Sequence, residues 1–573
     1  MNYNWEISQI DDKTVSSVAE EFQLPNAIAK IMVQRGINSR KKSRQFFYPD
    51  ASQLHDPYLM QGMKQAVARI NKLIENNGTL LLFGDYDVDG TTGTAAMYLF
   101  FKKLGVDVHF YIPDREREGY GVSLNGIDFA VGIGAELMIT CDCGITAVDQ
   151  TEYANSKGID VIITDHHKQD EELPNATAIL NPNQNNCTYP FKGLCGAGVA
   201  FKLLSAICIS RDLSQDYALK YTDLITLGIA TDLVPVLDEN RYIVQHGLLS
   251  MEKGANCGLN ALIETSGFSG KEITVGRLVF WIAPKINAAG RLGDASRAVK
   301  LMTTNNPVKA KLTAEELEQE NKRRQNVTSE IVENSIYNIH ANADRDKEKA
   351  TIVKGDGWHH GVIGIVASRI KEDYNKPTII ISFDEDGIGR GSCRSIPGFD
   401  IHNALGKCRH LLEGFGGHPM AAGLSLKKDN YKKFYQTFQD IATQEINEKM
   451  LTPRIKVDTS LNISEINSRM MKFLKALAPF GPGNMRPKFI GKSVKLRGLP
   501  RIIGKNNDTL KFTVTENKSL MEAIAFRMEK KYEHLISGKP IHLIFEVGEN
   551  DWNGQQRIQL EVKDIKSGEI PCA

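Results

Sequence analysis

The sequence has few cysteines for its length, nine in 573 residues. Small secreted proteins that depend on disulfides contain many more, so that class is excluded. Cys141 and Cys143 are separated by one residue, whereas zinc and redox pairs are usually separated by two. The cysteines therefore indicate a protein of the reducing cytoplasm, without a disulfide framework.

Long apolar runs are also missing, so we expect no segment that spans a membrane. The first residues, Met1–Glu6, do not have the pattern of a signal peptide. The formal net charge is only +1, so the chain as a whole does not attract nucleic acid, and any such site must be local. A length of 573 residues predicts about three or four domains.

The most informative stretch runs from Thr79 to Thr92. Its first residues, Thr79–Phe83, are apolar and predict a short buried strand. Carboxylates follow at every second position: Asp85, Asp87 and Asp89. Gly90 then opens a predicted helix, Thr91–Leu104. Carboxylates this close repel one another unless a cation neutralises them, and hard divalent ions, Mg²⁺ or Mn²⁺, suit oxygen ligands best.

Two other interpretations of this acidic stretch stay open. Asp-x-Asp-x-Asp-Gly also opens an EF-hand calcium loop, which requires a preceding helix and a Glu at its twelfth position. Counted from Asp85, the twelfth residue is Ala96, and a predicted strand precedes the loop. The other alternative is a solvated acidic turn that binds no ion.

The chain continues as alternating strands and helices. Strands are predicted at Val106–Ile112, Glu136–Thr140 and Asp160–Thr164, with a helix at Ala147–Lys157. This alternation predicts an α/β domain with a parallel βαβ sheet. Ligands of such sheets bind at the carboxyl ends of the strands.

Residues that can bind metals follow several of these strand ends. Asp142 comes two residues after one strand, and Asp165-His166-His167 follows another. A later apolar run, Leu224–Ala230, is interpreted as a fourth case and leads to Asp232. A single Asp at such a place is often a turn or helix cap, and a single His is often a surface residue. Their repetition predicts two cations about 4 Å apart, an arrangement that cleaves phosphate esters.

These motifs resemble those of the DHH phosphoesterase family, in particular its branch of bacterial single-strand-specific 5′→3′ DNA exonucleases. The first four family motifs match at Asp85–Gly90, Cys141–Gly144, Asp165–His167 and Ala230–Pro235. The motif that follows them matches at Ile282–Arg291. Motifs of the accessory DHHA1 domain match at Gly357–Arg369, Gly391–Ser395 and Gly416–Gly423, and the entry to the last domain matches at Leu477–Asn484. The resemblance covers about residues 80 to 490.

The resemblance implies a set of metal ligands. Asp87 serves one metal and Asp89 the other, with Asp142 bridging them. His166 and Asp232 complete the shell of the second ion. The implied cofactors are therefore two divalent cations, Mn²⁺ or Mg²⁺.

The resemblance also implies two catalytic residues and leaves one carboxylate open. His167 is expected to face the scissile phosphate, and Asp165 to orient a histidine. Many relatives carry a His where this sequence has Phe83, so the first metal has fewer protein ligands. Asp85 or water is expected to occupy the remaining coordination position of this metal. Asp85 can be a ligand, a residue behind the ligands or a helix cap.

A pocket for the 5′-phosphate of DNA is implied as well. Arg115, Arg291, Ser392, Arg394 and His418 are its expected residues. From the sequence alone, Arg115 also fits a surface loop with local ion pairs, Arg291 a helix end, and His418 a loop histidine bonded to backbone. Ser392 and Arg394 are predicted to lie in a Gly-rich loop.

The domain organisation follows from these assignments. We expect an N-terminal helical extension at 1–50, a DHH catalytic domain at 51–305, a connecting helix at 306–345, a DHHA1 α/β domain at 346–452, and an OB-like domain at 453–573. The basic run that starts at Arg40 is interpreted as a solvated helix face. Thr313 and Glu316 predict a capping box at the start of one long polar helix that ends near His340.

Shorter elements are predicted on both sides of this division. Residues from about 200 to 305 should be mainly helical, and the DHHA1 domain should contain strands Thr351–Lys354 and Thr378–Phe383 with a helix at Gly364–Ile370. The last domain should contain strands Ser493–Leu499, Leu510–Val514, Met521–Phe526, Ile541–Val547 and Arg557–Val562. Asn553-Gly554 is a hairpin turn signal. Five short strands predict an OB-type β-barrel that binds single strands.

Between Arg486 and Lys511 there are eight Lys or Arg and one acid, Asp508. A solvated face explains this run, but a groove that follows a nucleic-acid backbone explains it better.

We therefore expect a metal-dependent exonuclease that degrades single-stranded DNA 5′→3′ to mononucleotides. One alternative is a DHH phosphodiesterase of short oligonucleotides or cyclic dinucleotides, and another is a non-catalytic single-strand-binding subunit. The resemblance implies single-strand-binding protein and a RecQ-type helicase as partners in recombination and repair, and we expect a monomer.

Overall fold

The computed structural model describes residues 3–254, 256–341, 348–552 and 555–568. The chain divides into two compact units. Unit 1 comprises residues 1–4, 113–120 and 284–454, and unit 2 comprises residues 5–112, 121–283 and 455–573. The predicted fold class is confirmed: an α/β domain with a parallel sheet, a second α/β domain and a C-terminal β-barrel. The finer division into five parts stays a prediction.

The first residues are mainly helical, as predicted, with α1 (Asp12–Phe22), α2 (Asn26–Gln34), α3 (Arg40–Phe47) and α4 (Met63–Glu75). A strand that we did not predict, β1 (Asn4–Ile7), pairs with β12 (Arg454–Val457). Ser39 caps α3, and the basic side chains of this helix are mostly exposed, which agrees with a solvated face.

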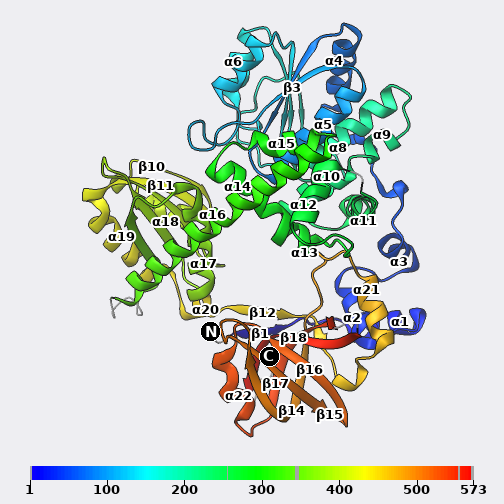
Figure 1. Cartoon of the computed structure of the whole chain (residues 1–573), viewed down its shortest axis with the longest axis vertical. Coiled ribbons are helices and arrows are strands. Elements are labelled where there is room, and N and C mark those ends of the chain that lie inside the picture. The colour runs from blue at the N-terminus through cyan, green and yellow to red at the C-terminus, as the bar shows by residue number, and fades with distance from the viewer. Residues whose placement is uncertain (1–2, 255, 342–347, 553–554, 569–573) are drawn as a thin grey trace. The chain divides into compact units, whose positions relative to one another are not determined.

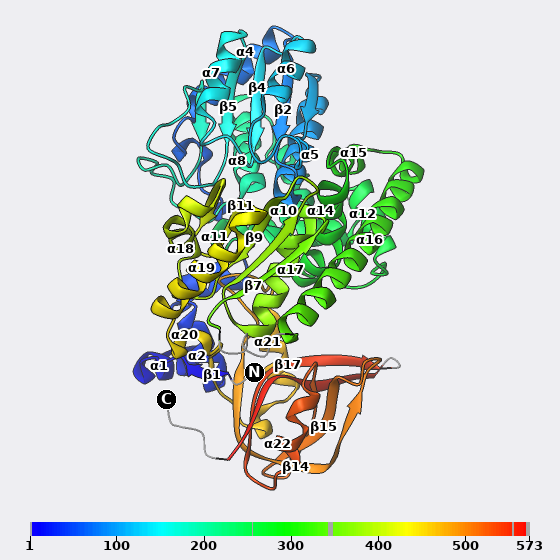
Figure 2. The ribbon, with the colours of Figure 1, turned by 90° about the vertical axis from the view of Figure 1, so that its left-hand side faces the viewer.

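A five-stranded parallel sheet forms the core of the first α/β domain (Figure 2). Its order is β3-β2-β4-β5-β6, from β2 (Thr79–Gly84), β3 (Asp107–Tyr111), β4 (Leu137–Cys141), β5 (Asp160–Thr164) and β6 (Ala178–Leu180). Strands β2, β4 and β5 are apolar and almost completely buried because helices cover both faces of the sheet. One face packs on α6 (Leu124–Gly132) and α7 (Val148–Ser156). The strands predicted at Thr79–Phe83, Val106–Ile112, Glu136–Thr140 and Asp160–Thr164 are confirmed, and β6 was missed.

Helix α5 (Val88–Lys103) follows β2 and begins three residues before the predicted start at Thr91. The acidic stretch suggested a longer loop, but Asp87 is the N-cap and Asp89 lies in the first turn. Carboxylates are favoured at a helix N-terminus because they complement the helix dipole.

The segment after the sheet is helical, as predicted: α8 (Gly196–Ser210), α9 (Asp216–Leu219), α10 (Thr222–Thr231), α11 (Asp238–Glu252), α12 (Cys257–Thr265), α13 (Val275–Arg277), α14 (Ala283–Leu292) and α15 (Ser296–Thr303). The interpretation of Leu224–Ala230 as a strand is wrong, because these residues belong to α10. Helix α10 contacts α5, α8 and α11, and its residues from Thr222 to Ala230 are buried. A helix buried on all sides lacks an apolar stripe, so periodicity cannot distinguish it from a buried strand.

Unit 1 is built around a second sheet with the order β10-β11-β9-β8-β7 (Figure 1). Its strands are β7 (Thr351–Asp356), β8 (Thr378–Phe383), β9 (Ile388–Arg394), β10 (Gly414–His418) and β11 (Ala421–Lys427). Helices α16 (Pro307–His340) and α17 (His360–Tyr374) pack on one face. Helices α18 (Ile401–Lys407) and α19 (Tyr431–Glu445) pack on the other, and α20 (Glu448–Leu451) follows.

Two predictions for unit 1 are wrong. Helix α16 begins at Pro307 with Asn306 as its N-cap, so Thr313 lies inside the helix and does not form a capping box. The Asn-Pro pair is itself a helix-start signal. Ser392 and Arg394 lie in strand β9 and not in a loop. Gly391 is present because a Cβ there would lie 2.9 Å from the Leu424 side chain, so the glycine serves close packing in the sheet.

The sequence predicted a polar helix for α16, but one side of this helix is buried. Its buried residues include Leu317, Ile331 and Ile339, and the helix contacts α15, α17 and β7. It is therefore an integral part of the packing of unit 1.

The C-terminal strands form a closed barrel (Figure 1). They are β14 (Phe489–Ile503), β15 (Thr509–Glu516), β16 (Ser519–Ala525), β17 (Ile541–Trp552) and β18 (Gln555–Ser567). The short β13 (Thr459–Ser460) pairs in parallel with the start of β14, and α21 (Ser468–Ala476) and α22 (Tyr532–Ile536) pack nearby. All five predicted strands are confirmed. Strands β17 and β18 are antiparallel neighbours, while the turn signal Asn553-Gly554 lies outside the described residues.

A buried arginine fixes several segments of unit 2. The Arg241 guanidinium donates to the carbonyls of Phe46 (2.7 Å), Ala478 (2.7 Å) and Pro479 (3.3 Å), and it stacks on the Phe46 ring.

Within the described ranges, the chain contains no helix with the length and hydropathy needed to cross a membrane.

Candidate active site

The first acidic motif lies where β2 passes into α5. The Oδ1 of Asp87 accepts a hydrogen bond from the Gly90 N–H at 3.1 Å, so Asp87 is the residue that caps the helix. Asp85 is buried and is not the cap. Of the roles left open for Asp85, those of a ligand and of a residue behind the ligands remain.

Asp89 is fixed where three helices cross. The N–H of Gly196 donates to its Oδ2 at 2.6 Å, and the N–H of Ala197 donates to its Oδ1 at 2.9 Å. Both donors lie in the first turn of α8. A Cβ added to Gly228 of α10 would lie only 2.5 Å from Asp89 Oδ1. Glycine at 228 therefore lets α10 approach the carboxylate closely.

Asp142 lies directly after β4 in a backbone conformation that non-glycine residues rarely adopt, with φ of 63°. A Cβ on Gly196 would lie 2.4 Å from the Asp142 Cβ, so α8 can begin here only with a glycine. The adjacent Cys141 and Cys143 are buried free thiols, as is Cys195 at the start of α8. Burial raises the pKa of all three thiols well above the ordinary value.

The loop after β5 is organised by Asp165. Its Oδ1 accepts hydrogen bonds from the N–H groups of His166 (2.7 Å) and His167 (3.1 Å) and contacts His167 Nδ1 at 2.7 Å. Its Oδ2 accepts from the Ile145 N–H at 2.9 Å. Although burial lowers it, the hydrogen bond and charge of Asp165 raise the pKa of His167 to about 8, so the ring is mostly protonated at neutral pH and both of its nitrogens donate. Asp165 thus lies where it orients His167.

His166 lies among three of the carboxylates. Its Nε2 is 3.1 Å from Asp142 Oδ1, 3.6 Å from Asp232 Oδ2 and 4.0 Å from Asp89 Oδ2. Asp232 comes from the C-terminal end of helix α10 and not from the end of a strand. The structure therefore brings together side chains from five separate elements of unit 2.

Three overlapping groups of donor atoms result, each with its atoms within 4.8 Å of one another. They are Asp85, Asp87 and Asp142; Asp89, His166 and Asp232; and Asp142, His166 and His167. All five residues predicted as metal ligands belong to at least one group. Whether each one binds a metal stays a prediction.

Burial makes these carboxylates costly in the charged form. It raises the pKa of Asp85 to about 8, with a further contribution from Asp87. It also raises the pKa of Asp232 to about 8, together with the charges of Asp89 and Asp87. For Asp142, burial and the neighbouring acids raise the pKa well above the ordinary value. A bound cation would remove this cost by compensating the negative charge.

The donor set fits divalent cations. Two of its buried atoms, Asp85 Oδ1 and His166 Nε2, make no hydrogen bond of ordinary geometry within the described residues, although Asp142 Oδ1 lies 3.1 Å from the His166 nitrogen. A buried polar atom without a partner carries a penalty of about 1–3 kcal/mol, which a metal bond can offset. Most of the donors are carboxylate oxygens, which are the ligands that Mn²⁺ and Mg²⁺ prefer.

Four of the five residues predicted for phosphate binding line one pocket of about 410 Å³ in unit 1: Arg115, Arg291, Ser392 and Arg394. The Arg394 side chain is held by hydrogen bonds to Ser392 Oγ (3.1 Å), Ser368 Oγ (3.1 Å) and the Cys393 carbonyl (2.8 Å). Burial lowers the pKa of Arg394, and the charge of Arg115 lowers it further. Clustered guanidinium groups repel one another, which favours binding of an anion.

The pocket also includes Arg390 and His360, which were not among the predicted site residues. His360 is the first residue of α17, a helix of 15 residues whose N-terminus opens into the pocket. Helix N-termini favour anions because their N–H groups and dipole are oriented toward the ligand. A Cβ on Gly364 would lie 3.0 Å from the Arg394 guanidinium, so this glycine leaves room for the arginine.

His418 does not line this pocket. It is exposed at the end of β10. Ala421 of β11 is the register partner of both His418 and Arg394. His418 and Arg394 therefore occupy one row across three strands, with backbones roughly 10 Å apart. A role for His418 in binding the DNA end stays a prediction.

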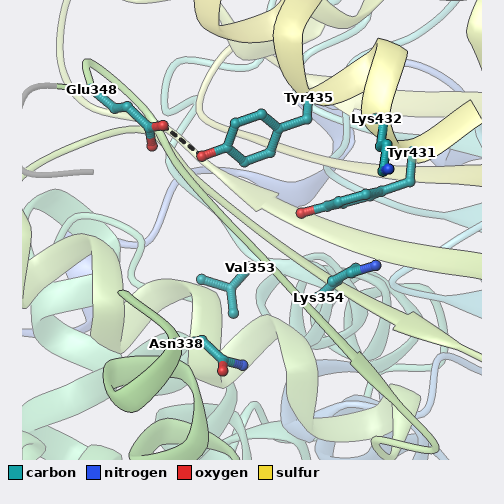
Figure 3. A pocket seen from close by; sticks show the side chains of 7 residues that line it. All are labelled: Asn338, Glu348, Val353, Lys354, Tyr431, Lys432 and Tyr435. Atoms are coloured by element: carbon teal, nitrogen blue, oxygen red, sulfur yellow. Dashed lines mark hydrogen bonds between the residues drawn. The ribbon is translucent and has the colours of Figure 1, made fainter. Parts of the chain in front are cut away.

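A second groove of about 430 Å³ in unit 1 contains none of the predicted site residues (Figure 3). It is lined by side chains from α16, β7 and α19, among them Asn338, Lys354, Lys432 and Tyr435. The Tyr435 hydroxyl donates to Glu348 at 2.6 Å. This groove lacks the arginines of the anion pocket.

Comparison with known families agrees with the fold and with the motifs. The chain matches the DHH family, N-terminal domain, over residues 79–229, the DHHA1 domain over residues 347–444, and the RecJ OB domain over residues 457–564. The candidate metal ligands lie in or just after the first match, and most of the anion pocket lies in the second.

Comparison with individual proteins extends the agreement to the whole chain. The single-stranded-DNA-specific exonuclease RecJ of Bacillus subtilis is 36% identical over 99% of this chain and 71% of its own length. Crystal structures of RecJ from Thermus thermophilus with Mn²⁺ and with Mg²⁺ are each 26% identical, with TM-scores of 0.84 and 0.79. They match 99% of this chain and 80% and 79% of their own chains. The chain therefore belongs to the RecJ family.

Proposed function

We propose that the protein is a metal-dependent exonuclease that degrades single-stranded DNA from the 5′ end and releases 5′-mononucleotides. The convergence of Asp87, Asp89, Asp142, His166 and Asp232 in one buried cluster carries the proposal. A RecJ relative named as a single-stranded-DNA-specific exonuclease, and solved RecJ structures with Mn²⁺ and Mg²⁺, support it.

Two divalent cations, Mn²⁺ or Mg²⁺, would be held by this cluster. When bound, such ions lower the pKa of water, polarise the phosphodiester and compensate the charge of the leaving oxygen. Asp87 and Asp89 would hold one ion each, Asp142 would bridge them, and His166 and Asp232 would complete the second site. Asp165 would hold the Nδ1 proton of His167 and keep the ring oriented toward the phosphate.

The arginine pocket of unit 1 would bind the 5′-phosphate. Arg115, Arg291 and Arg394 supply positive charge, and Ser392 supplies a hydroxyl. Guanidinium groups bind phosphate oxygens in pairs, which suits a terminal phosphate better than the single charge of a phosphodiester. Recognition of this end would determine the 5′→3′ direction.

The cellular setting remains part of the proposal. The cysteines of the described residues are all free thiols, which is usual in the reducing cytoplasm. Single-strand-binding protein and a RecQ-type helicase as partners, a role in recombination and repair, and a monomeric state stay predictions from the resemblance.

The direct test is digestion of end-labelled DNA with Mn²⁺ or Mg²⁺. We expect degradation of single strands with a free 5′ end, and protection of double strands and of strands blocked at the 5′ end. Blocking the 3′ end should have no effect. Preference for di- or trinucleotides over long strands would favour a phosphodiesterase of short substrates, and binding without cleavage would favour a non-catalytic subunit.

The ligand assignment is tested by Asp142→Ala. Metal catalysis is worth several kcal/mol, and each 1.36 kcal/mol is tenfold in rate, so turnover should fall by about 100-fold or more. Binding of single-stranded DNA should be largely retained. Asp149→Ala is the matched control, because Asp149 is an exposed Asp of α7 outside the cluster. Unchanged turnover of Asp142→Ala would refute the assignment.

A further inference from the structure

Strand β6 and the segment that follows it lie beside the histidine loop. β6 pairs in parallel with β5, and the Leu180 carbonyl accepts a hydrogen bond from the Asp165 N–H at 3.0 Å. The chain beyond Leu180 therefore continues alongside residues 165–167. This strand end was not predicted from the sequence, and it presents amides rather than acids.

Two asparagines after β6 reach the backbone of both histidines. Asn183 Nδ2 donates to the His166 carbonyl at 2.6 Å. Asn181 Nδ2 donates to the His167 carbonyl at 2.8 Å. The Asn183 N–H donates to Asn181 Oδ1 at 2.7 Å, which joins the two amides in one network. Each histidine thus has its own carboxamide donor.

The segment that carries these asparagines is itself fixed. Gln184 Nε2 donates to the carbonyls of Ile179 (3.0 Å) and Asn181 (3.2 Å). Lys192 Nζ donates to the carbonyls of Pro182 (2.5 Å) and Cys187 (2.7 Å). The two amide donors therefore project from a rigid support.

The histidine loop is consequently held from two sides. Asp165 accepts hydrogen bonds from the N–H groups of His166 and His167, while the asparagines donate to the carbonyls of the same two residues. Fixing both ends of these residues restricts their backbone rotation and hence the direction of both rings. Partners of this kind, one step behind a metal ligand, orient the ligand and strengthen metal binding.

We propose that Asn181 and Asn183 are positioning residues that hold the rings of His166 and His167 in the geometry needed for divalent-cation binding. The proposal rests on the proposed function. A purely structural role is the alternative for both residues. The two roles can be separated at Asn183 because its side chain is exposed, so water can replace its contact and its removal should scarcely affect folding.

The test compares Asn183→Ala with Asn186→Ala in the full-length protein. Asn186 is an exposed asparagine of the same segment, and its side chain makes no hydrogen bond to any described residue. Mn²⁺ affinity is measured by isothermal titration calorimetry, and backbone hydrogen exchange is measured by mass spectrometry on peptides that contain residues 165–168. Thermal unfolding of both variants is recorded without metal.

For Asn183→Ala we expect about tenfold weaker Mn²⁺ binding, the lower end of the range for such residues. Hydrogen exchange at His166 and His167 should be faster, while the unfolding temperature stays close to that of the unmodified protein. Asn186→Ala should change none of the three. Asn181→Ala, which also disturbs a buried side chain, should weaken Mn²⁺ binding at least as much or fail to fold.

Mn²⁺ affinity and loop exchange that stay unchanged in Asn183→Ala would overturn the proposal. So would a loss of affinity that is fully matched by a loss of global stability, because that result shows a structural role. Failure of the unmodified protein to bind Mn²⁺ or to cleave DNA would instead refute the proposed function. In that case the exchange data still decide whether the asparagines hold the histidine loop.

Discussion

At the scale of single residues, the site brings negative charge together where solvent cannot compensate it. Asp85, Asp89 and Asp142 are almost completely buried, and Asp142 also adopts a strained φ. Because the folded metal-free protein raises the pKa of Asp85 and of Asp232 to about 8, these groups are largely protonated at neutral pH. Deprotonated oxygens are needed to bind a cation, so metal binding must displace protons.

We predict that Mn²⁺ binding releases protons and becomes tighter as the pH rises from about 6 to about 8. The sign follows from the raised pKa values of Asp85 and Asp232, since fewer protons remain to be displaced at higher pH. Calorimetric titrations in two buffers of different ionisation enthalpy measure the number of protons released. Identical heats in both buffers at every pH would contradict the prediction.

The sequence predicted which residues gather here but not how each one is held. The spacing of Asp85, Asp87 and Asp89 after an apolar strand identified the site. The hydrogen bonds from α8 to Asp89 were not predictable, because they join residues more than 100 positions apart. Arg390 belongs to no quoted motif, and His360 lies in the motif Gly357–Arg369 without having been selected as a site residue, so only the fold places the two in the anion pocket.

At the scale of elements, three helices meet at the acid cluster through glycines. A Cβ at Gly93 of α5 would lie 2.4 Å from Cys141 Sγ, and a Cβ at Gly196 of α8 would lie 2.4 Å from Asp142. Gly228 of α10 plays the same part beside Asp89. The position of the carboxylates thus depends on how closely the helices can approach.

We predict that Gly228→Ala lowers the free energy of unfolding by about 1–3 kcal/mol and weakens Mn²⁺ binding, because the new methyl would overlap Asp89 and Ala197. Gly132→Ala is the control: a Cβ on this glycine of α6 meets no atom within 4 Å. That control should be neutral or stabilising by up to about 1 kcal/mol. Denaturant unfolding and calorimetry with Mn²⁺ provide the measurements. An unchanged Mn²⁺ affinity of Gly228→Ala would show that the close approach of α10 to α5 does not position Asp89.

Elements were predicted best where flanking residues give direct signals. β5 and β8 have the predicted bounds because Gly, Pro and Asp residues limit short apolar runs. α10 was misassigned because it is buried on all sides, and β6 was missed because three residues carry no usable pattern. For α10 and β6, the tertiary packing rather than the local sequence determined the secondary structure.

At the scale of the whole molecule, charge is nearly balanced, so attraction to DNA has to come from local surfaces. β14 of the barrel exposes Lys492, Lys495, Arg497 and Arg501 on one strand. This agrees with the basic run in the sequence, and its contact with DNA stays a prediction.

We predict that the double variant Lys495→Ala/Arg497→Ala binds single-stranded DNA more weakly. The slope of the logarithm of the binding constant against the logarithm of the salt concentration should be smaller by about 1.4. Each phosphate neutralised by a basic side chain contributes roughly 0.7 to this slope. Lys432→Ala/Lys433→Ala, two exposed residues of α19, removes the same charge elsewhere and should change the slope less. Fluorescence anisotropy with labelled DNA in the absence of divalent metal measures both. Equal slopes for the two double variants would argue against a specific role of β14.

The buried thiols behind the acid cluster have a practical consequence. Cys141, Cys143 and Cys195 are inaccessible and strongly favour the protonated form, so alkylating reagents cannot modify them while the helices remain in place. Their rate of labelling therefore reports how often this region opens. Quenched-flow alkylation with and without Mn²⁺ would measure how often this region opens in each case. A lower opening frequency with Mn²⁺ would measure how strongly the cations stabilise the region.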